Sequence, residues 1–208
     1  MNVGITLRVD NLPERQEKRE AVDQSLIRWV IEAGHTPILI PNLLFNGNTS
    51  DDNFLRVFLS ATNVQGLILS GGHDVGLMPE RDLTEYFLLD WAEQNKLPVL
   101  GICRGMQIMS LHAGTKLVKI DGHIATRHKL ITRGLNGVWP DVVNSYHGKT
   151  VAECPVDYSI AATTSSGHIE AITHNILPWE GWMWHPEREV SFCEIELVRF
   201  RRLVDDEN

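Results

Sequence analysis

The sequence lacks the features of a secreted, membrane or nucleic-acid-binding protein. Its three cysteines are scattered and form neither a disulfide framework nor a zinc motif. No apolar run reaches the length that spans a bilayer, and the first residues lack the basic region, apolar stretch and cleavage site of a signal peptide. The net charge of -8 disfavours nucleic acid as a partner. We therefore expect a cytoplasmic protein with no nucleic-acid or membrane partner.

The composition is that of one ordinary domain. A chain of 208 residues with 43% hydrophobic residues can bury a full-sized core. No internal repeat, low-complexity tract or linker divides the sequence. We expect a single domain over residues 1–208, while the oligomeric state stays open, a homodimer included.

The first half alternates short apolar strands with helical segments, a pattern typical of α/β proteins with a parallel sheet covered by helices. The expected strands are residues 3–7, 37–40, 66–69 and 98–102, and the expected helices are 22–33, 83–93, 106–113 and 192–203. In the second helix, Leu83, Tyr86, Phe87, Asp90 and Trp91 share one face. Beyond residue 115, turn signals such as Asp121-Gly122 and Asn136-Gly137 predict antiparallel strands.

Two further segments are assigned by composition. Residues 13–19 are expected to form a charged loop placed to line a site entrance. Residues 205–208 are expected to fray.

A nucleophile elbow is indicated by Gly101-Ile102-Cys103-Arg104-Gly105, which follows an apolar strand and precedes an apolar helix. The tight turn of an elbow requires small neighbours two residues away, and both are glycine. Cys103 would sit at a helix N-terminus, where the positive dipole end favours thiolate. The backbone N–H of Arg104 would face a developing oxyanion. A buried cysteine beside two accidental glycines is the simpler alternative.

A base for this thiol is predicted at His185-Pro186-Glu187, after the apolar run 181–184. Pro186 stiffens the turn, so that Glu187 can reach back to the imidazole and fix its tautomer. Alone, such a tripeptide is usually a surface turn. Combined with the elbow, it indicates the catalytic base.

The segment Ser70-Gly71-Gly72-His73-Asp74 follows the strand 66–69 at the edge where open α/β sheets bind ligands. Adjacent glycines let backbone N–H groups approach a ligand closely. We assign Gly71 and Gly72 to the second half of an oxyanion hole. A plain turn is the alternative.

In this order, Ser-Gly-Gly, Gly-Ile-Cys-Arg-Gly-Met-Gln and His-Pro-Glu resemble the class I glutamine amidotransferase superfamily over nearly the whole chain. They are most similar to its free-standing γ-glutamyl peptidase and γ-glutamyl-γ-aminobutyrate hydrolase branch. The resemblance implies a flavodoxin-like three-layer sandwich and a Cys-His-Glu triad. It also implies hydrolysis of a γ-glutamyl amide through a thioester on cysteine, with release of glutamate. No metal or organic cofactor is implied. The short chain and its Met-Trp-His-Pro-Glu-Arg-Glu segment resemble a compact subgroup that includes hydrolases of γ-glutamyl-CDP-amidate.

Residue by residue, the resemblance implies Cys103 as nucleophile with His185 and Glu187 as partners, and Gly72 with Arg104 as oxyanion donors. It implies that Gln107 holds the glutamyl group of a small-molecule substrate.

The segment Asn144-Ser145-Tyr146-His147 resembles the Asn-Ser-x-His segment that lines the substrate pocket in the hydrolase branch. Lys149 stands where that branch often has glutamine, which bears on the leaving group. Two interpretations of Arg127 and His128 stay open, namely contact with an anionic leaving group or a solvated loop.

The remaining residues are assigned to structure. His112, His123, His128 and His147 show no metal-binding spacing and are expected to be hydrogen-bonded histidines. Cys154 and Cys193 are expected to be inert. Trp179, Trp182 and Trp184 are expected to pack the sheet under the His185 turn, or one of them to stack on a base.

Two rival functions remain. A glutaminase subunit would use the same triad on glutamine and pass ammonia to a partner synthase. A non-catalytic sensor could retain the fold, although an intact triad speaks against it.

Overall fold

The structure is a computed structural model that describes residues 1–47, 53–132 and 138–205. The described residues form five α-helices: α1 (Gln24–Glu32), α2 (Phe54–Ala61), α3 (Pro79–Asn95), α4 (Arg104–His112) and α5 (Glu194–Asp205). Short 3₁₀ helices occupy Pro13–Arg15, Asn42–Leu44 and Pro186–Arg188. None of the helices in these ranges has the length and apolar character that crossing a bilayer requires.

The strands of the first half are β1 (Asn2–Thr6), β2 (Arg8–Leu12), β3 (Glu17–Ala21), β4 (Thr36–Ile40), β5 (Gly66–Leu69) and β6 (Val99–Ile102). Those of the second half are β7 (Leu117–Lys119), β8 (Ile124–Lys129), β9 (Ile131–Thr132), β10 (Val142–Tyr146), β11 (Lys149–Val151), β12 (Tyr158–Thr163), β13 (Ile169–His174) and β14 (Trp179–Trp182).

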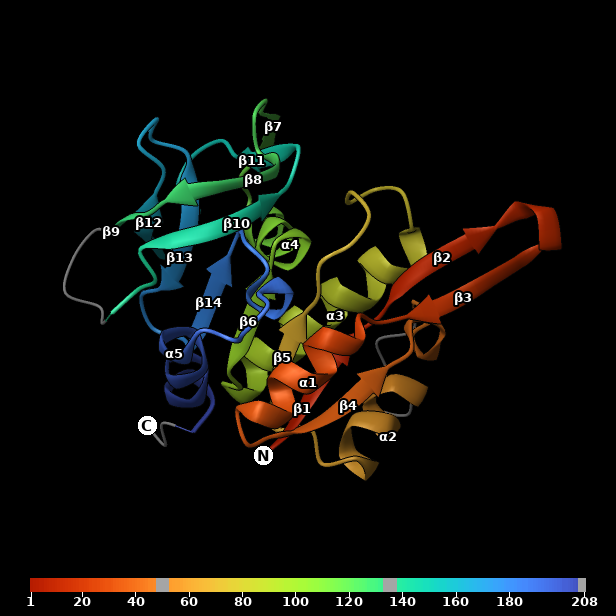
Figure 1. The fold of residues 1–208 in the computed structure, drawn as a ribbon. Helices are drawn as coiled ribbons and strands as arrows, with labels where there is room; N and C mark the ends of the chain where they lie inside the picture. Colours follow the sequence, from red (N-terminus) through yellow and green to blue (C-terminus); the bar gives the residue numbers. More distant parts are fainter. Residues whose placement is uncertain (48–52, 133–137, 206–208) are drawn as a thin grey trace.

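A central eight-stranded sheet has the order β4-β1-β5-β6-β14-β13-β12-β9. The first five strands are parallel to one another, and the last three pair antiparallel. Two antiparallel ladders, β8–β10 and β7–β11, lie beside this sheet (Figure 1). The prediction of a mostly parallel sheet with added antiparallel strands is therefore confirmed.

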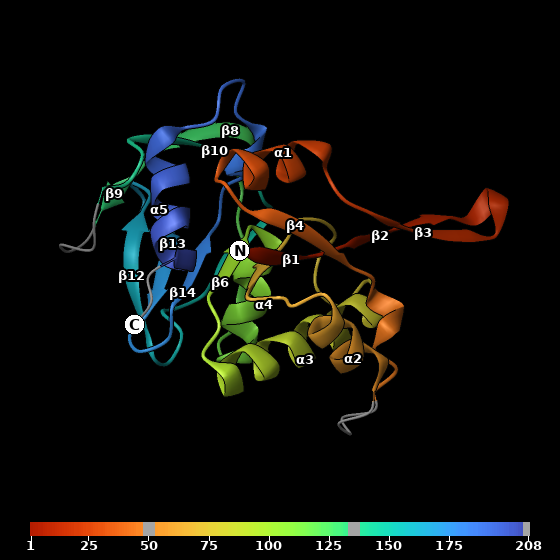
Figure 2. The ribbon, with the colours of Figure 1, turned by 90° about the horizontal axis from the view of Figure 1, so that it is seen from below.

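Helices cover both faces of the sheet. In Figure 2, α1 and α5 lie on one side, and α2, α3 and α4 on the other. Strands β5 and β6 are buried along their whole length, as the continuous apolar runs in their sequence predict for a sheet covered on both sides. On the first side, the fully buried Trp29 packs 4.8 Å from the Phe200 ring and 6.2 Å from the Trp182 ring. Such aromatic pairs add about 0.5–1.5 kcal/mol each beyond the burial of their area.

Helix α1 follows its sequence signals closely. Asp23 caps its N-terminus by accepting a hydrogen bond from the Ser25 N–H at 2.8 Å. Gly34 follows its end with a φ of +87°, which a residue with a side chain rarely adopts. The apolar stripe predicted for this helix, including Leu26 and Val30, is buried.

The five residues expected to share one face of α3 do not form its buried face, although Phe87 among them is buried. Leu83 is 52% exposed and Asp90 points to solvent, whereas Arg81, Glu85 and Leu88 are buried. The helix turns charged residues inward because Arg81 and Glu85 form an ion pair with each other there. Apolar periodicity alone does not predict a buried ion pair of this kind.

Residues 13–19 do not form the expected loop. They belong to the hairpin of β2 and β3, which projects from the body of the molecule in both views (Figures 1 and 2). Its turn contains the 3₁₀ helix Pro13–Arg15 and ends on Gln16, whose φ is 51°. The predicted turn at Asn136-Gly137 lies outside the described residues. So does the predicted fraying of residues 205–208, except at Asp205, which is the last residue of α5.

Candidate active site

Cys103 stands at the sharp turn between β6 and α4. Its φ of 52° and ψ of -102° are rare for a residue with a side chain, and such strain persists only where the surroundings enforce it. Its N–H donates to the Trp182 carbonyl of β14 at 2.7 Å, which holds the turn to the neighbouring strand. The side chain is 6% exposed. The local structure is therefore that of the predicted nucleophile elbow.

The two flanking glycines are required by close packing. A Cβ on Gly101 would lie 2.6 Å from the Gly105 carbonyl carbon, and a Cβ on Gly105 would collide with the Leu69 carbonyl at the end of β5. The first turn of α4 therefore rests directly against the end of β5. This contact brings the elbow next to the segment that follows β5.

His185 and Glu187 are brought together by the turn after β14. The His185 Nδ1 lies 2.7 Å from Glu187 Oε1, and both side chains are buried. Burial alone would lower the pKa of His185, but hydrogen bonds to Cys103 and Glu187 outweigh it and raise the pKa to about 9. His185 thus retains a proton at neutral pH.

Gly71 lies beside the imidazole of His185, and Gly72 lies beside Arg81 and Arg8. A Cβ on Gly71 would approach His185 Cε1 to 2.5 Å, and Gly72 has a φ of +145°. The Arg81 guanidinium holds this loop by donating to the Ser70 carbonyl at 2.6 Å and to the Gly71 carbonyl at 3.1 Å. Neither position has room for a side chain.

A buried ionic network under this loop was missed by sequence reasoning. Glu85 is fully buried and accepts from Arg81 Nε at 2.9 Å, from Thr6 Oγ1 at 2.7 Å and from the Arg104 guanidinium, which also pairs with Asp82. Burial would raise the pKa of Glu85, but the charges of Arg81 and Arg104 hold it below its usual value. The Arg–Glu spacing of four on a helix was the available signal. The network ties α3 to the elbow and the Gly-Gly loop.

The segment Asn144-Ser145-Tyr146-His147 lies mostly beneath the site rather than on its surface. Asn144 clamps the backbone of His185: its Oδ1 accepts from the His185 N–H at 3.0 Å and its Nδ2 donates to the His185 carbonyl at 2.7 Å. The fully buried Ser145 donates to the His123 carbonyl at 2.6 Å. Tyr146 is 44% exposed, with its ring 5.9 Å from that of His185. Tyr146 is thus the member of this segment whose side chain a substrate can reach.

Gln107 and Lys149 connect the elbow helix to β11. Gln107 Nε2 donates to the Lys149 carbonyl at 3.1 Å. The Lys149 ammonium pairs with Asp74 at 2.9 Å, across from the Gly-Gly loop. Arg188 lies 4.9 Å over the Tyr146 ring. Each of the two cations thus has a carboxylate beside it, Asp74 for Lys149 and Glu187 for Arg188.

Arg127 and His128 are neighbours in strand β8, so their side chains point to opposite faces of the strand. Both oxygens of Glu189 accept from Arg127 Nη1, at 3.0 and 3.1 Å. His128 turns the other way, with its ring 4.1 Å from that of His123. These residues belong to a paired strand and not to a loop, while the Arg127 side chain is half exposed; contact of either residue with a leaving group stays a prediction.

The histidines behave in two ways. His112 bonds to Asp90 at 2.8 Å, as expected of an ordinary histidine. His123 and His147 are also hydrogen-bonded, to each other at 3.3 Å, but they face the fully buried Glu170 as well. Burial, together with the neighbouring His128, lowers the pKa of His123 to about 4.

The other assigned residues are structural. Trp179, Trp182 and Trp184 are at most 3% exposed, so none offers a surface on which a base could stack. Cys154 donates to the Tyr158 carbonyl at 3.2 Å, and Cys193, like it, is a free thiol.

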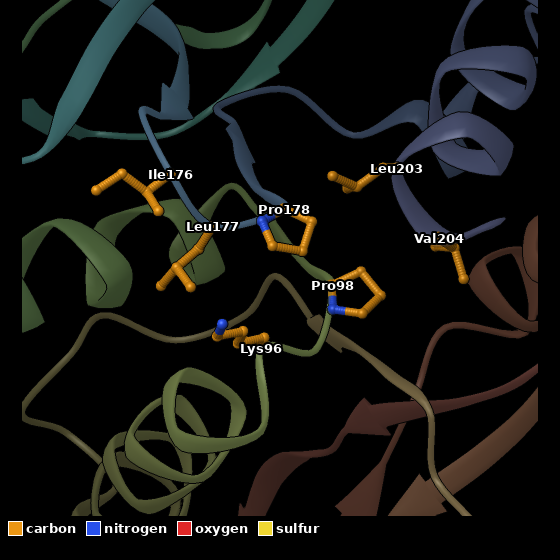
Figure 3. Close-up of a pocket in the computed structure, with 7 residues that line it drawn as sticks. All are labelled: Lys96, Pro98, Ile176, Leu177, Pro178, Leu203 and Val204. Atoms are coloured by element: carbon orange, nitrogen blue, oxygen red, sulfur yellow. The ribbon is translucent and has the colours of Figure 1, made fainter. Parts of the chain in front are cut away.

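A pocket of about 370 Å³ lies at the other end of the sheet (Figure 3). Its lining includes Pro98 and Pro178, which precede β6 and β14, and Leu203 and Val204 of α5. Cys103 and His185 follow the opposite, carboxyl ends of those strands. The pocket is therefore distinct from the region of the elbow.

The sequence is similar to that of known proteins over most of its length. Residues 3–187 match the peptidase C26 family. The chain is 27% identical over 142 residues to γ-glutamyl-CDP-amidate hydrolase of Campylobacter jejuni, covering 65% of this chain and 68% of that protein. It is 24% identical over 217 residues to γ-glutamyl-γ-aminobutyrate hydrolase of Escherichia coli O157:H7, covering 89% and 85%. It is 29% identical over 129 residues to one subunit of the glutamine-hydrolysing GMP synthase of Methanococcus aeolicus, covering 60% and 65%, just under two thirds of that protein.

A solved structure has the same fold. A GMP synthase subunit protein of Thermoplasma acidophilum superimposes with a TM-score of 0.71 at 20% identity, covering 99% of this chain and 92% of that one. At this identity the likeness concerns the fold alone.

Proposed function

The chain belongs to the peptidase C26 family, and we propose that it hydrolyses the γ-glutamyl amide bond of a small conjugate and releases glutamate. The family and the two hydrolase relatives support a cysteine-type hydrolase. The observation that carries the proposal is Cys103 on its strained elbow, in hydrogen-bonding contact with a His185 that Glu187 orients.

In the first step, the Cys103 sulfur attacks the γ-carbonyl carbon of the glutamyl group as a thiolate. The backbone N–H groups of Gly72 and Arg104 stabilise the oxyanion, each such donor being worth roughly 10²- to 10³-fold in rate. The C–N bond then breaks, and His185 gives its proton to the leaving nitrogen. A pKa of about 9 suits this role, because His185 holds that proton at neutral pH.

In the second step, neutral His185 takes a proton from water as the oxygen attacks the thioester carbon. The C–S bond breaks, which regenerates the Cys103 thiolate and the protonated imidazole and releases glutamate. Glu187 keeps Nδ1 protonated throughout, so Nε2 faces the sulfur and the water.

The charges around the site favour an anionic leaving group. Lys149, beside the Gly-Gly loop, pairs with Asp74; Arg188, over Tyr146, lies 3.7 Å from Glu187; and Arg8, whose Cβ is close to Gly72, pairs with Asp10. An anionic leaving group would compete with these carboxylates for the three cations. Phosphates bind such clusters through charge-assisted hydrogen bonds. Of the two candidate conjugates, γ-glutamyl-CDP-amidate fits these cations better, because its leaving group carries phosphates. The leaving group of γ-glutamyl-γ-aminobutyrate carries a single carboxylate.

The experiment is to measure glutamate release from glutamine, γ-glutamyl-γ-aminobutyrate, γ-glutamyl dipeptides and γ-glutamyl-CDP-amidate, with Cys103→Ala as the blank. We expect fast release from one anionic conjugate and little from glutamine. Lys149→Gln should raise KM for the diphosphate conjugate about 3- to 10-fold with little change in kcat, whereas Lys119→Gln, on the neighbouring strand, should change neither. Equal turnover of all conjugates would contradict an anionic leaving-group site.

A glutaminase subunit is the second candidate, because the Methanococcus relative is a subunit of GMP synthase. Under this function, the same triad would hydrolyse glutamine and pass ammonia to a separate synthase. Glutamine turnover that is weak alone and rises with a co-purified synthase would favour it over the hydrolase.

A further inference from the structure

Four side chains that are distant in sequence converge beside the β8–β10 ladder. His123 precedes β8, His128 lies in it, His147 follows β10, and Glu170 belongs to β13. One potential ligand atom from each lies within 4.8 Å of those from all the others. None of the four has a role in the proposed hydrolysis.

The distances among three of the four ligand atoms match the edges of a metal-centred tetrahedron. His123 Nδ1 lies 3.3 Å from His147 Nε2 and 3.5 Å from Glu170 Oε1, and the last two atoms are 3.6 Å apart. A tetrahedral zinc ion, with bonds of about 2.0–2.1 Å to nitrogen and oxygen, holds its ligands about 3.3–3.4 Å apart. These three atoms therefore need to move only slightly to share one ion.

Hydrogen bonding within the cluster leaves its charge unsatisfied. A bond between His123 and His147 would pair those two rings, yet neither oxygen of Glu170 has a hydrogen-bond partner among the described residues. Nε2 of His128 is likewise buried without one in the described part of the chain. A fully buried carboxylate costs several kcal/mol unless a cation or donors compensate it. A divalent ion would satisfy both groups at once.

The surroundings hold two of the histidines in orientations suited to a metal. His147 Nδ1 lies 2.9 Å from the Lys149 carbonyl, so this nitrogen donates and Nε2 presents its lone pair to the cluster. Ser145 fixes the His123 backbone through the 2.6 Å bond to its carbonyl. A hydrogen bond from the second ring nitrogen to a carbonyl is the usual support of a metal-bound histidine.

We propose that His123, His128, His147 and Glu170 form a closed, structural zinc site. Nitrogen and oxygen donors in a four-coordinate arrangement fit Zn²⁺, and a site with four protein ligands has no open position for catalysis. The ion would fasten the β8–β10 ladder to β13. It would also help to hold the proposed substrate-binding region in place, because the Lys149 carbonyl accepts hydrogen bonds from both His147 and Gln107.

The first test is metal content and binding of the wild-type chain. Protein stripped with a chelator is titrated with Zn²⁺ against a chromophoric competitor, and melting is followed with and without the ion. We expect one equivalent of tightly bound zinc and a Tm higher by about 5 °C or more. Cobalt in place of zinc should give the absorption of a tetrahedral site. No zinc binding together with an unchanged Tm would overturn the proposal.

Variants locate the ion. Glu170→Gln and His147→Ala should weaken zinc binding at least about 100-fold, since loss of an outer-shell partner alone costs 10- to 100-fold. His128→Ala keeps the test decisive if the buried variants do not fold, because His128 is only partly buried. His112→Ala, at a histidine bonded to Asp90 outside the cluster, is the matched control and should bind zinc like wild type. Full binding in His128→Ala would remove that residue from the site and refute the four-ligand assignment.

Discussion

In the parallel part of the sheet, the backbone places the groups proposed to react: Cys103 and Gly72 follow the carboxyl ends of β6 and β5, and close backbone packing at Gly105 fixes their distance. In the antiparallel part, which comprises the β8–β10 ladder beside the central sheet and the strands β13, β12 and β9 within it, side chains hold the backbone instead. Asn144 clamps His185, and Ser145 fixes His123. The first arrangement depends on strand order and small residues, the second on buried polar contacts. Changes in the first should therefore affect chemistry, and changes in the second geometry and stability.

Cys103→Ala should have the largest effect on turnover, a loss of about 10⁴-fold or more. It removes the proposed nucleophile and leaves the elbow, because alanine keeps the Cβ and makes no new contact. Melting and steady-state kinetics, with Cys193→Ala as the matched control, check this. Retained turnover would refute the mechanism, and a large loss of Tm would show that the thiol serves packing as well.

Glu187→Gln should lower kcat by about 10²- to 10⁴-fold, since the imidazole loses the group that fixes its tautomer. It should also change the pH dependence. Turnover that depends on protonated His185 falls as pH rises through about 9 in the wild type. Removing one cause of the raised pKa moves this fall to lower pH in the variant. An identical pH profile in both proteins would exclude Glu187 as the partner.

The raised pKa of His185 also determines how the stability of the protein changes with pH. The pKa of His185 is higher in the folded chain, about 9, than its ordinary 6.5. Its contribution to the free energy of unfolding is therefore fully present below about pH 6.5 and is lost as pH rises through 9. Urea unfolding at pH 6.5 and 9.5 should show this loss in the wild type, and a smaller one in Glu187→Gln.

Asn144→Ala tests the antiparallel part. It leaves the His185 N–H and carbonyl without their side-chain partner, which should cost about 1–3 kcal/mol of stability. We expect kcat to fall about 10- to 100-fold because the imidazole is less well placed. Asn175→Ala, at an exposed asparagine bonded to Ser159, is the control and should change neither quantity. A kcat loss without any loss of stability would favour direct substrate contact by Asn144.

The parallel part was largely predictable from sequence. Strand 66–69 agrees with the structure to the residue, and the contact of His185 with Glu187 is the one expected. Local signals suffice there because each strand is a continuous apolar run and the elbow is contiguous in sequence. The roles of these residues in catalysis remain predictions.

The antiparallel part and α3 were less predictable because their contacts are distant in sequence. His123 and His147 are separated by 24 residues, and Glu170 lies on a further strand, so no spacing motif joins them. The buried Arg81 and Glu85 contradict apolar periodicity, since each is stabilised only by its partners in the fold. Pairing of this kind depends on three-dimensional structure.

The smallest expected effect concerns the contact of Glu196 with Trp184, which lies between the two parts. Glu196 of α5 accepts from Trp184 Nε1 at 2.7 Å, just beyond β14, and burial raises its pKa to about 7. The folded chain keeps a proton that the unfolded chain releases above about pH 4.5, so stability falls as pH rises from 4.5 to 7, by about 3 kcal/mol at most. Glu196→Gln removes this loss and retains the acceptor for Trp184. Its new amide N–H₂ group needs partners, so the net gain at pH 8 should be about 1 kcal/mol. Urea unfolding at pH 4 and pH 8 should show that gain only at pH 8, with kcat unchanged. A gain in the free energy of unfolding of equal size at both pH values would mean that packing around Glu196, and not its buried charge, limits stability there.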